Sequence, residues 1–236
     1  TVLLVLAVLS DAPTATRCER YQTPRKRNPP EMMTMKCSGP WVELRASANS
    51  DDAVLRLFGE IGIEVQAIEV VKALDDLRDV PLTVEINSLG GSVFEGWAIF
   101  NALKRRKAST ITRIEGIAAS MASVILVAGD TVEAYDNSML MIHNPSTATW
   151  GDADRLRKSA DTLDKVREGI VDAYAAKSKQ PRDIIKAWMD DETWFDGNEA
   201  EAVGLVDTVM AAELGQVAAA VARAKAQSPR RMTVKA

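Results

Sequence analysis

Short segments of this chain alternate apolar and polar residues, and longer segments repeat apolar residues at helical spacing. Strands are predicted at 41–46, 53–58, 82–86, 110–115, 138–142 and 205–209. Helices are predicted at 65–77, 93–106, 150–177, 181–189 and 198–203, and a further apolar helix starts near Ser120. Because strands that alternate with helices form βαβ units, the pattern predicts an α/β fold with a largely parallel sheet.

The regular pattern begins only after Pro40. Residues 2–9 are apolar but too few to span a bilayer, and residues 17–30 are rich in Pro, Thr and Arg, which is typical of disorder. We therefore expect residues 1–40 to form a disordered or non-native extension outside the fold. One domain is expected over residues 41–210, followed by a tail at 211–236 that is helical and then frayed. The helix at 150–177 is long enough to project from the core or to pack on another subunit.

Composition excludes several classes of function. The 236 residues are 47% apolar and 26% charged, the balance of an ordinary globular protein. A net charge of −4 gives no reason to expect a nucleic-acid partner. The two cysteines, Cys18 and Cys37, lack Cys or His neighbours at zinc-binding spacing. We expect no metal site, no cofactor and no membrane partner.

The chain has one histidine, His143, and it directly follows the apolar strand at 138–142. Ser120 lies shortly before it, among alanines at the start of an apolar helix. A nucleophilic serine needs a general base within hydrogen-bond reach, and only His143 can supply an imidazole. The alternative is a small-residue helix packed closely on a sheet, with a strand-end histidine that bonds to the backbone.

The dipeptide Gly90–Gly91 lies between a predicted strand and a predicted helix. Two glycines let backbone N–H groups approach an anion closely, although a simple tight turn would explain them too. Nucleotide binding is not indicated, because the phosphate-loop and dinucleotide-binding glycine patterns are both absent. Sites in parallel sheets form beyond the carboxyl ends of strands, and both this turn and Ser120 fall at such ends.

Four motifs now occur in a recognisable order. They are INSLGGSV at 86–93, GIAASMAS at 116–123, MIHNP at 141–145, and ETWF at 192–195 with EA and GLVD at 199–200 and 204–207. Over residues 41–209 the chain resembles the ClpP-like serine proteases, the family of the Clp protease proteolytic subunit. It resembles most the head-maturation (prohead) proteases of tailed phages and prophages. That finer resemblance rests on the sequences GSVFEG and ETWF and on the divergent N-terminal part.

The resemblance implies a role for each matching residue. Ser120 matches the family's nucleophile and His143 its general base. The backbone N–H groups of Gly91 and Met121 match the donors of the oxyanion hole.

The third catalytic residue is where this chain departs from the family. Glu192 stands where the housekeeping subunits carry an aspartate, and the adjacent Asp191 and Asp190 are alternatives, since a shift of one residue would select Asp191. A solvated acidic turn or a helix cap is the structural alternative for all three side chains.

The resemblance also implies a crotonase-like spiral of βαβ units with a protruding helical arm, the handle, at residues 151–177. It implies a homo-oligomeric ring that needs no metal or cofactor. The expected activity is a serine endopeptidase that cuts phage scaffold and capsid proteins during head maturation. It would act in the cytoplasm of a bacterial or phage-infected cell, or inside the prohead.

Three alternatives stay open. The first alternative is a housekeeping Clp proteolytic subunit that works with an AAA+ unfoldase, and the second is an inactive ClpP-like scaffold protein. Crotonase-type folds also serve acyl-CoA chemistry. The pairing of Ser120 with His143 argues against that chemistry, because acyl-CoA hydratases rely on carboxylates.

Overall fold

The computed structural model describes residues 32–36, 41–47, 52–77 and 79–212. The helices are α1 (Ala67–Asp76), α2 (Val93–Lys104), α3 (Met121–Leu126), α4 (Ala153–Ser178), α5 (Arg182–Asp190) and α6 (Gly197–Ala202). The strands are β1 (Met32–Lys36), β2 (Val42–Ser47), β3 (Ala53–Phe58), β4 (Leu82–Ser88), β5 (Thr110–Ala119), β6 (Thr131–Tyr135), β7 (Met139–Ile142), β8 (Thr193–Asp196) and β9 (Thr208–Met210).

All these strands belong to one mixed sheet. Its order is β1-β2-β3-β4-β5-β6-β9, and β7 joins it by pairing with β5 and β8. The strand pairs from β3 to β9 along this path are parallel, as is the β5–β7 pair, whereas the pairs β1–β2, β2–β3 and β7–β8 are antiparallel. The predicted α/β class with a largely parallel sheet is confirmed.

The sheet begins earlier than the sequence pattern indicates. Strand β1 falls inside the segment 1–40 that was expected to stand outside the fold, and it pairs antiparallel with β2. Residues 1–31 and 37–40, and residues 213–236 of the expected tail, lie outside the described residues. Strands β6 and β8 were also not predicted, because their few residues are held by partners distant in the sequence.

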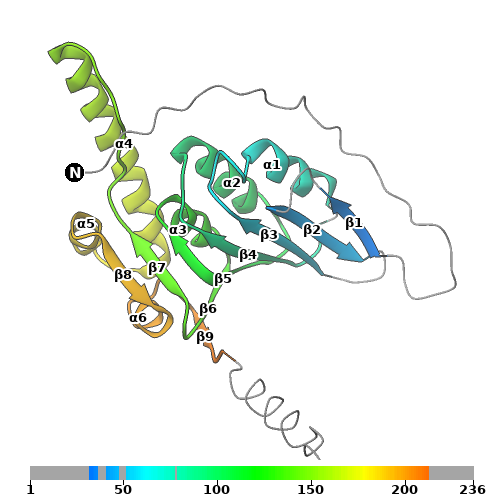
Figure 1. Cartoon of the computed structure of the whole chain (residues 1–236). Helices are drawn as coiled ribbons and strands as arrows, with labels where there is room; N and C mark the ends of the chain where they lie inside the picture. Colours follow the sequence, from blue (N-terminus) through cyan, green and yellow to red (C-terminus); the bar gives the residue numbers. More distant parts are fainter. Residues whose placement is uncertain (1–31, 37–40, 48–51, 78, 213–236) are drawn as a thin grey trace, which may run out of the picture.

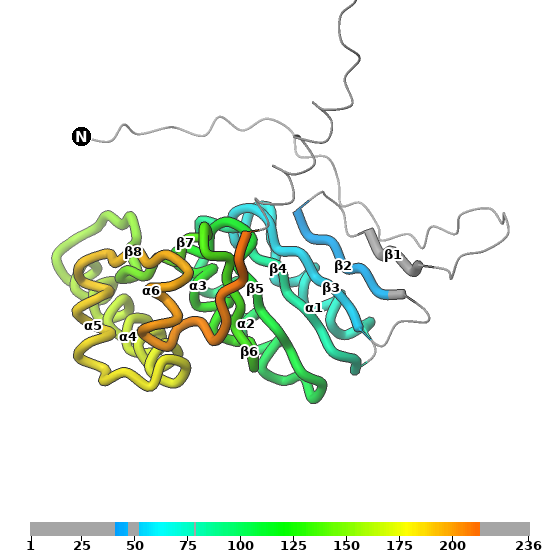
Figure 2. The backbone as a smooth tube through the Cα atoms, turned by 90° about the horizontal axis from the view of Figure 1, so that it is seen from below, coloured from blue at the N-terminus to red at the C-terminus, as the bar shows by residue number. Residues whose placement is uncertain are grey.

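Helices α1 and α2 lie together against one face of the sheet (Figure 1). Strand β3 shows why: Ala53, Leu55 and Leu57 are buried, whereas the residues between them are partly exposed. Burial of the apolar face under the helices supplies the main driving force for this layer. Figure 2 shows α4, α5, α6 and β8 gathered beyond β7, at the opposite end of the molecule from β2 and β3.

Helix α4 corresponds to the predicted helix at 150–177. Asp152 caps its first turn by accepting a hydrogen bond from the Arg155 N–H at 2.8 Å. Its N-terminal half is mostly exposed and extends away from the rest of the chain, whereas Ile170, Val171 and Tyr174 are buried against the core (Figure 1). Among the residues that the structure describes, packing therefore fixes the C-terminal half of α4 and not the N-terminal half.

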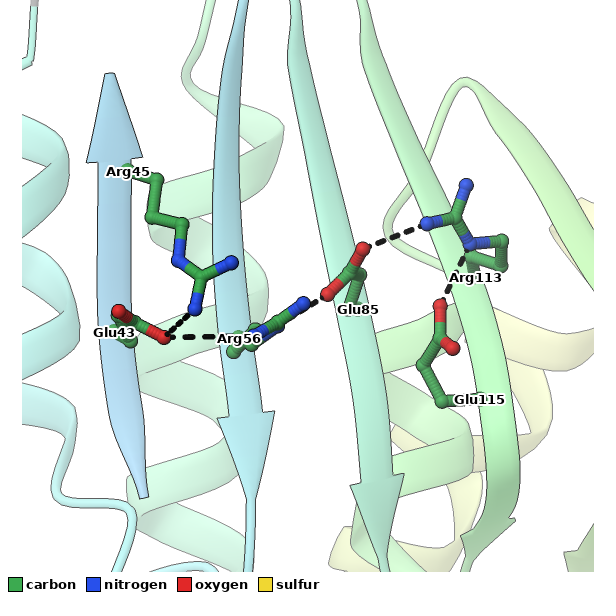
Figure 3. Close-up of polar contacts among 6 residues, drawn as sticks. All are labelled: Glu43, Arg45, Arg56, Glu85, Arg113 and Glu115. Carbon is green, nitrogen blue, oxygen red and sulfur yellow. Dashed lines mark hydrogen bonds and ion pairs between the residues drawn. The ribbon is translucent and has the colours of Figure 1, made fainter. Parts of the chain in front are cut away.

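Charged side chains cross the other face of the sheet as a connected ion network, drawn in Figure 3. Glu85 on β4 is its centre: its two carboxylate oxygens accept from Arg56 at 2.5 Å and from Arg113 at 2.7 Å. The network continues outward to Glu43, Arg45 and Glu115. The hydrogen bond from Arg56 to Glu85 raises the pKa of that guanidinium.

We expect Glu85→Gln to lower the free energy of unfolding by about 1–2 kcal/mol, because two guanidinium groups lose their shared carboxylate. This loss of stability is smaller than for a fully buried ion pair, since the side chains of Arg56 and Arg113 are 35% and 22% exposed. Urea unfolding measures it. The control, Arg157→Gln, breaks an exposed pair with Asp154 and is expected to change stability by less than about 0.5 kcal/mol. Equal effects of the two variants would contradict the central position of Glu85.

Candidate active site

Ser120 lies at the sharp turn where β5 ends and α3 begins. Its φ of 54° and ψ of −125° are unusual for a residue that is not glycine. Such strain persists only where the surroundings enforce it, and here the Ser120 N–H donates to the Met141 carbonyl at 3.0 Å. The turn leaves the serine side chain partly exposed at the carboxyl end of a central strand.

His143 is brought to Ser120 by the register of two parallel strands. Ala119 of β5 pairs with Met141 of β7, so the two residues that follow these strands lie side by side. The Nε2 atom of His143 is 2.7 Å from the Oγ atom of Ser120, and the imidazole side chain is 27% exposed. The structure therefore brings together the serine and the imidazole that the sequence singled out.

Glu192 lies on the side of the other ring nitrogen of the histidine, Nδ1. Strand β8 runs antiparallel to β7 with Thr193 opposite Ile142, which places Glu192 beside His143. The Glu192 Oε2 atom is 3.8 Å from His143 Nδ1, longer than a hydrogen bond, and its side chain is 59% exposed. Within the described residues this is the carboxylate that pairs with the imidazole. The alternative, Asp191, is an exposed residue at the end of α5.

The Gly90–Gly91 turn lies directly against the serine. A Cβ atom on Gly90 would come within 2.6 Å of the Ser120 Cβ and 2.9 Å of the Met121 backbone nitrogen. A Cβ atom on Gly91 would come within 2.2 Å of the Ile61 carbonyl oxygen. Both glycines also have positive φ, at 99° and 139°. Close approach and backbone conformation therefore both require glycine here.

Hydrogen bonding leaves two backbone donors unpaired at this place. Gly91 faces Ile61 in an isolated parallel bridge. The Ile61 N–H donates to the Gly90 carbonyl at 2.7 Å and the Ser92 N–H donates to the Ile61 carbonyl at 2.8 Å, so the bonds of this bridge leave the Gly91 N–H unused. Met121 is the first residue of α3, where a helix leaves its N–H groups without a partner. Within the described part of the chain, neither the Gly91 nor the Met121 N–H has a hydrogen-bond acceptor.

A polar brace that sequence analysis missed holds the segment after His143. Asn144 donates to Asp190 at 2.7 Å and accepts from Arg167 Nε at 2.8 Å, and Arg167 also donates to Asp190 at 2.5 Å. This brace ties the end of β7 to α4 and to the end of α5, close to Glu192. The adjacency of Asn144 to the lone histidine was the one available sign of it.

No group of three or more His, Cys, Asp or Glu residues within the described ranges is placed to hold a metal ion. Among the same residues, every helix is too short or too polar to cross a membrane.

The ordered motifs that carry this site match a known family. The sequence model of the Clp protease family matches residues 52–213, more than half of the chain. The chain belongs to the Clp protease family. Membership confirms the ClpP-like fold, and it makes the protein one of a family of peptidases, which are hydrolases.

Similar proteins bear names from this family. An ATP-dependent Clp protease proteolytic subunit 1 from Chlamydia pneumoniae is 34% identical, over 65% of this chain and 84% of its own length. The ATP-dependent Clp protease proteolytic subunit of Pleurastrum terricola is 36% identical, over 62% of this chain and 75% of its own. Subunit 2 from Bacillus licheniformis is 34% identical, over 59% and 74%. None of these names mentions phage head maturation, so they do not confirm that finer prediction.

Proposed function

We propose that this member of the Clp protease family is a serine endopeptidase with Ser120 as nucleophile and His143 as general base. The observation that carries the proposal is the distance of 2.7 Å between His143 Nε2 and Ser120 Oγ. Neutral imidazole at this distance accepts the serine proton as Oγ attacks the scissile carbonyl carbon. The same nitrogen then protonates the leaving amine. Water, deprotonated by His143, hydrolyses the acyl-enzyme and regenerates Ser120.

The tetrahedral intermediates carry a negative oxygen that needs fixed donors. The unpaired N–H groups of Gly91 and Met121 are the proposed oxyanion donors, because Gly91 belongs to the turn that contacts Ser120 and Met121 directly follows Ser120. These two donors stabilise the oxyanion without any rearrangement of the backbone, since the glycine turn and the first turn of α3 are already held in place.

Glu192 is the proposed partner that orients His143. We expect Glu192→Gln to lower kcat by roughly 10- to 100-fold, less than the roughly 10⁴-fold typical of a buried triad carboxylate. The reason is that the Glu192 side chain is 59% exposed and 3.8 Å from His143 Nδ1. Asp191→Asn is the matched control, and its kcat should stay within about threefold of wild type. If Asp191→Asn caused the larger loss, the assignment would pass to Asp191.

A fluorogenic peptide assay without nucleotide or metal tests the proposed chemistry. The proposal predicts turnover of an unstructured peptide and its loss after treatment with a sulfonyl fluoride. A well-folded oligomer that cleaves none of a diverse peptide library would instead support an inactive scaffold protein.

For the biological setting we propose a homo-oligomeric ring in the bacterial or phage-infected cytoplasm that processes phage scaffold and capsid proteins. The sequences GSVFEG and ETWF support this proposal. The names of the relatives favour the alternative, a proteolytic subunit that works with an AAA+ unfoldase.

Incubation with a folded capsid scaffold protein, with and without an added Clp unfoldase and ATP, separates the two settings. A maturation protease is expected to cut the scaffold unaided. Cleavage that requires both the unfoldase and ATP would overturn the phage assignment and support the alternative.

A further inference from the structure

Ser123 is a second serine one turn beyond Ser120, and the proposed chemistry gives it no role. It is completely buried in α3. Its Oγ donates to the carbonyl oxygen of Ser120 at 2.5 Å, and its backbone N–H donates to the same oxygen at 3.0 Å. The Ser120 carbonyl is thus held from two directions by one residue.

Tyr174 of α4 completes this arrangement from a different element. Its hydroxyl lies 2.7 Å from Ser123 Oγ, and the tyrosine side chain is fully buried. The single hydroxyl proton of Ser123 is already given to the Ser120 carbonyl, so Tyr174 must be the donor in this bond. Burial raises the pKa of Tyr174, which keeps its phenol protonated and able to donate.

The geometry of the peptide unit connects these bonds to the reaction. The bond between Ser120 and Met121 is planar and trans, so its C=O and its N–H point in opposite directions. Fixing the Ser120 carbonyl therefore fixes the direction of the Met121 N–H. That N–H is one of the two proposed oxyanion donors, and the value of such a donor depends on its alignment.

We propose that Ser123 and Tyr174 are positioning residues that aim the Met121 N–H at the oxyanion through the Ser120–Met121 peptide plane. The proposal rests on the proposed function of Ser120 as nucleophile and Met121 as oxyanion donor. Tyr174 acts only through Ser123, because its hydroxyl bonds to Ser123 and not to the peptide itself. The long helix α4 in this way contributes to the geometry of a site whose reacting atoms it does not touch.

Steady-state kinetics of Ser123→Ala, Tyr174→Phe and the double variant test this role on the full-length protein. We expect Ser123→Ala to lower kcat by about 10- to 100-fold and Tyr174→Phe by about 3- to 10-fold, with KM unchanged in both. The double variant should match Ser123→Ala within about twofold, because Tyr174 has nothing left to act through. The inhibition constant of a peptide aldehyde, whose adduct with Ser120 carries the oxyanion, should rise in parallel with the loss of kcat.

Ser138→Ala is the matched control for the loss of a buried serine. Ser138 is as buried as Ser123 but lies elsewhere in the fold, directly before β7. Its hydroxyl donates to the Tyr135 carbonyl at 2.8 Å. Its kcat is expected to equal that of wild type. A comparable fall of kcat in Ser138→Ala, a rise of KM instead of a fall of kcat, or independent effects in the double variant would each overturn the positioning role. Absence of activity in wild type and Ser138→Ala alike would instead count against the proposed function.

Discussion

Ser120→Ala is expected to lower kcat by about 10⁵-fold or more, and His143→Ala by a similar factor. Without Oγ no acyl-enzyme forms, and without the imidazole Ser120 loses the group among the described residues that lies within hydrogen-bond distance of its Oγ to take the proton. Because the two residues act as one unit, the double variant should be no worse than either single variant. Hydrolysis of a fluorogenic peptide, with the thermal unfolding midpoint measured in parallel, checks both statements.

Ser159→Ala is the control for this pair of variants. Ser159 is partly exposed on α4, and among the described residues its hydroxyl bonds to the Arg155 carbonyl of its own helix, so its loss should leave kcat unchanged. A mock preparation from host cells that do not express the protein gives the background from host proteases. If Ser120→Ala kept more than about a tenth of wild-type kcat above that background, another nucleophile would have to be sought.

Gly91→Ala is the second change with a large expected effect. A Cβ atom there would lie 2.2 Å from the Ile61 carbonyl oxygen, and the φ of 139° is strained for any L side chain. The turn must therefore move, and the Gly91 N–H moves with it. We expect kcat to fall by about 10²- to 10³-fold. The free energy of unfolding should fall by about 1–3 kcal/mol.

Gly169→Ala is the matched glycine variant. Gly169 lies in the interior of α4, where a Cβ atom would meet Trp97 at an ordinary 3.5 Å. Removing a helical glycine should raise the free energy of unfolding by about 0.5–1 kcal/mol and leave kcat unchanged. If Gly91→Ala were also active and stable, the turn could not be the rigid oxyanion donor proposed.

Much of the site could be predicted from the sequence because its signals are local. Ser120 stands in a motif at a strand end, and His143 is the one imidazole in the chain. Strand register then brings them together, since β5 and β7 pair in parallel, Ser120 directly follows β5 and His143 directly follows β7. The alternation of strands and helices predicted the α/β class for the same reason: each βαβ unit is encoded within a short stretch.

The features that sequence analysis missed depend on contacts between distant residues. The hydrogen bond of Tyr174 was not predicted, because its hydroxyl partner Ser123 is 51 residues away in the sequence. The brace of Asn144, Arg167 and Asp190 likewise joins three elements. Strand β8 has four residues and, in the part of the chain that the structure describes, its one partner is β7, so tertiary pairing decides its conformation.

Labelling with a fluorophosphonate probe, read by peptide mass spectrometry, tests the central assignment most directly. The variants to compare are wild type, Ser120→Ala and His143→Ala. An activated serine at this turn predicts one modified peptide that carries the probe on Ser120, and it predicts no labelling in either variant. Labelling of a different residue, or none in a well-folded oligomer, would contradict the assignment of Ser120 as the nucleophile.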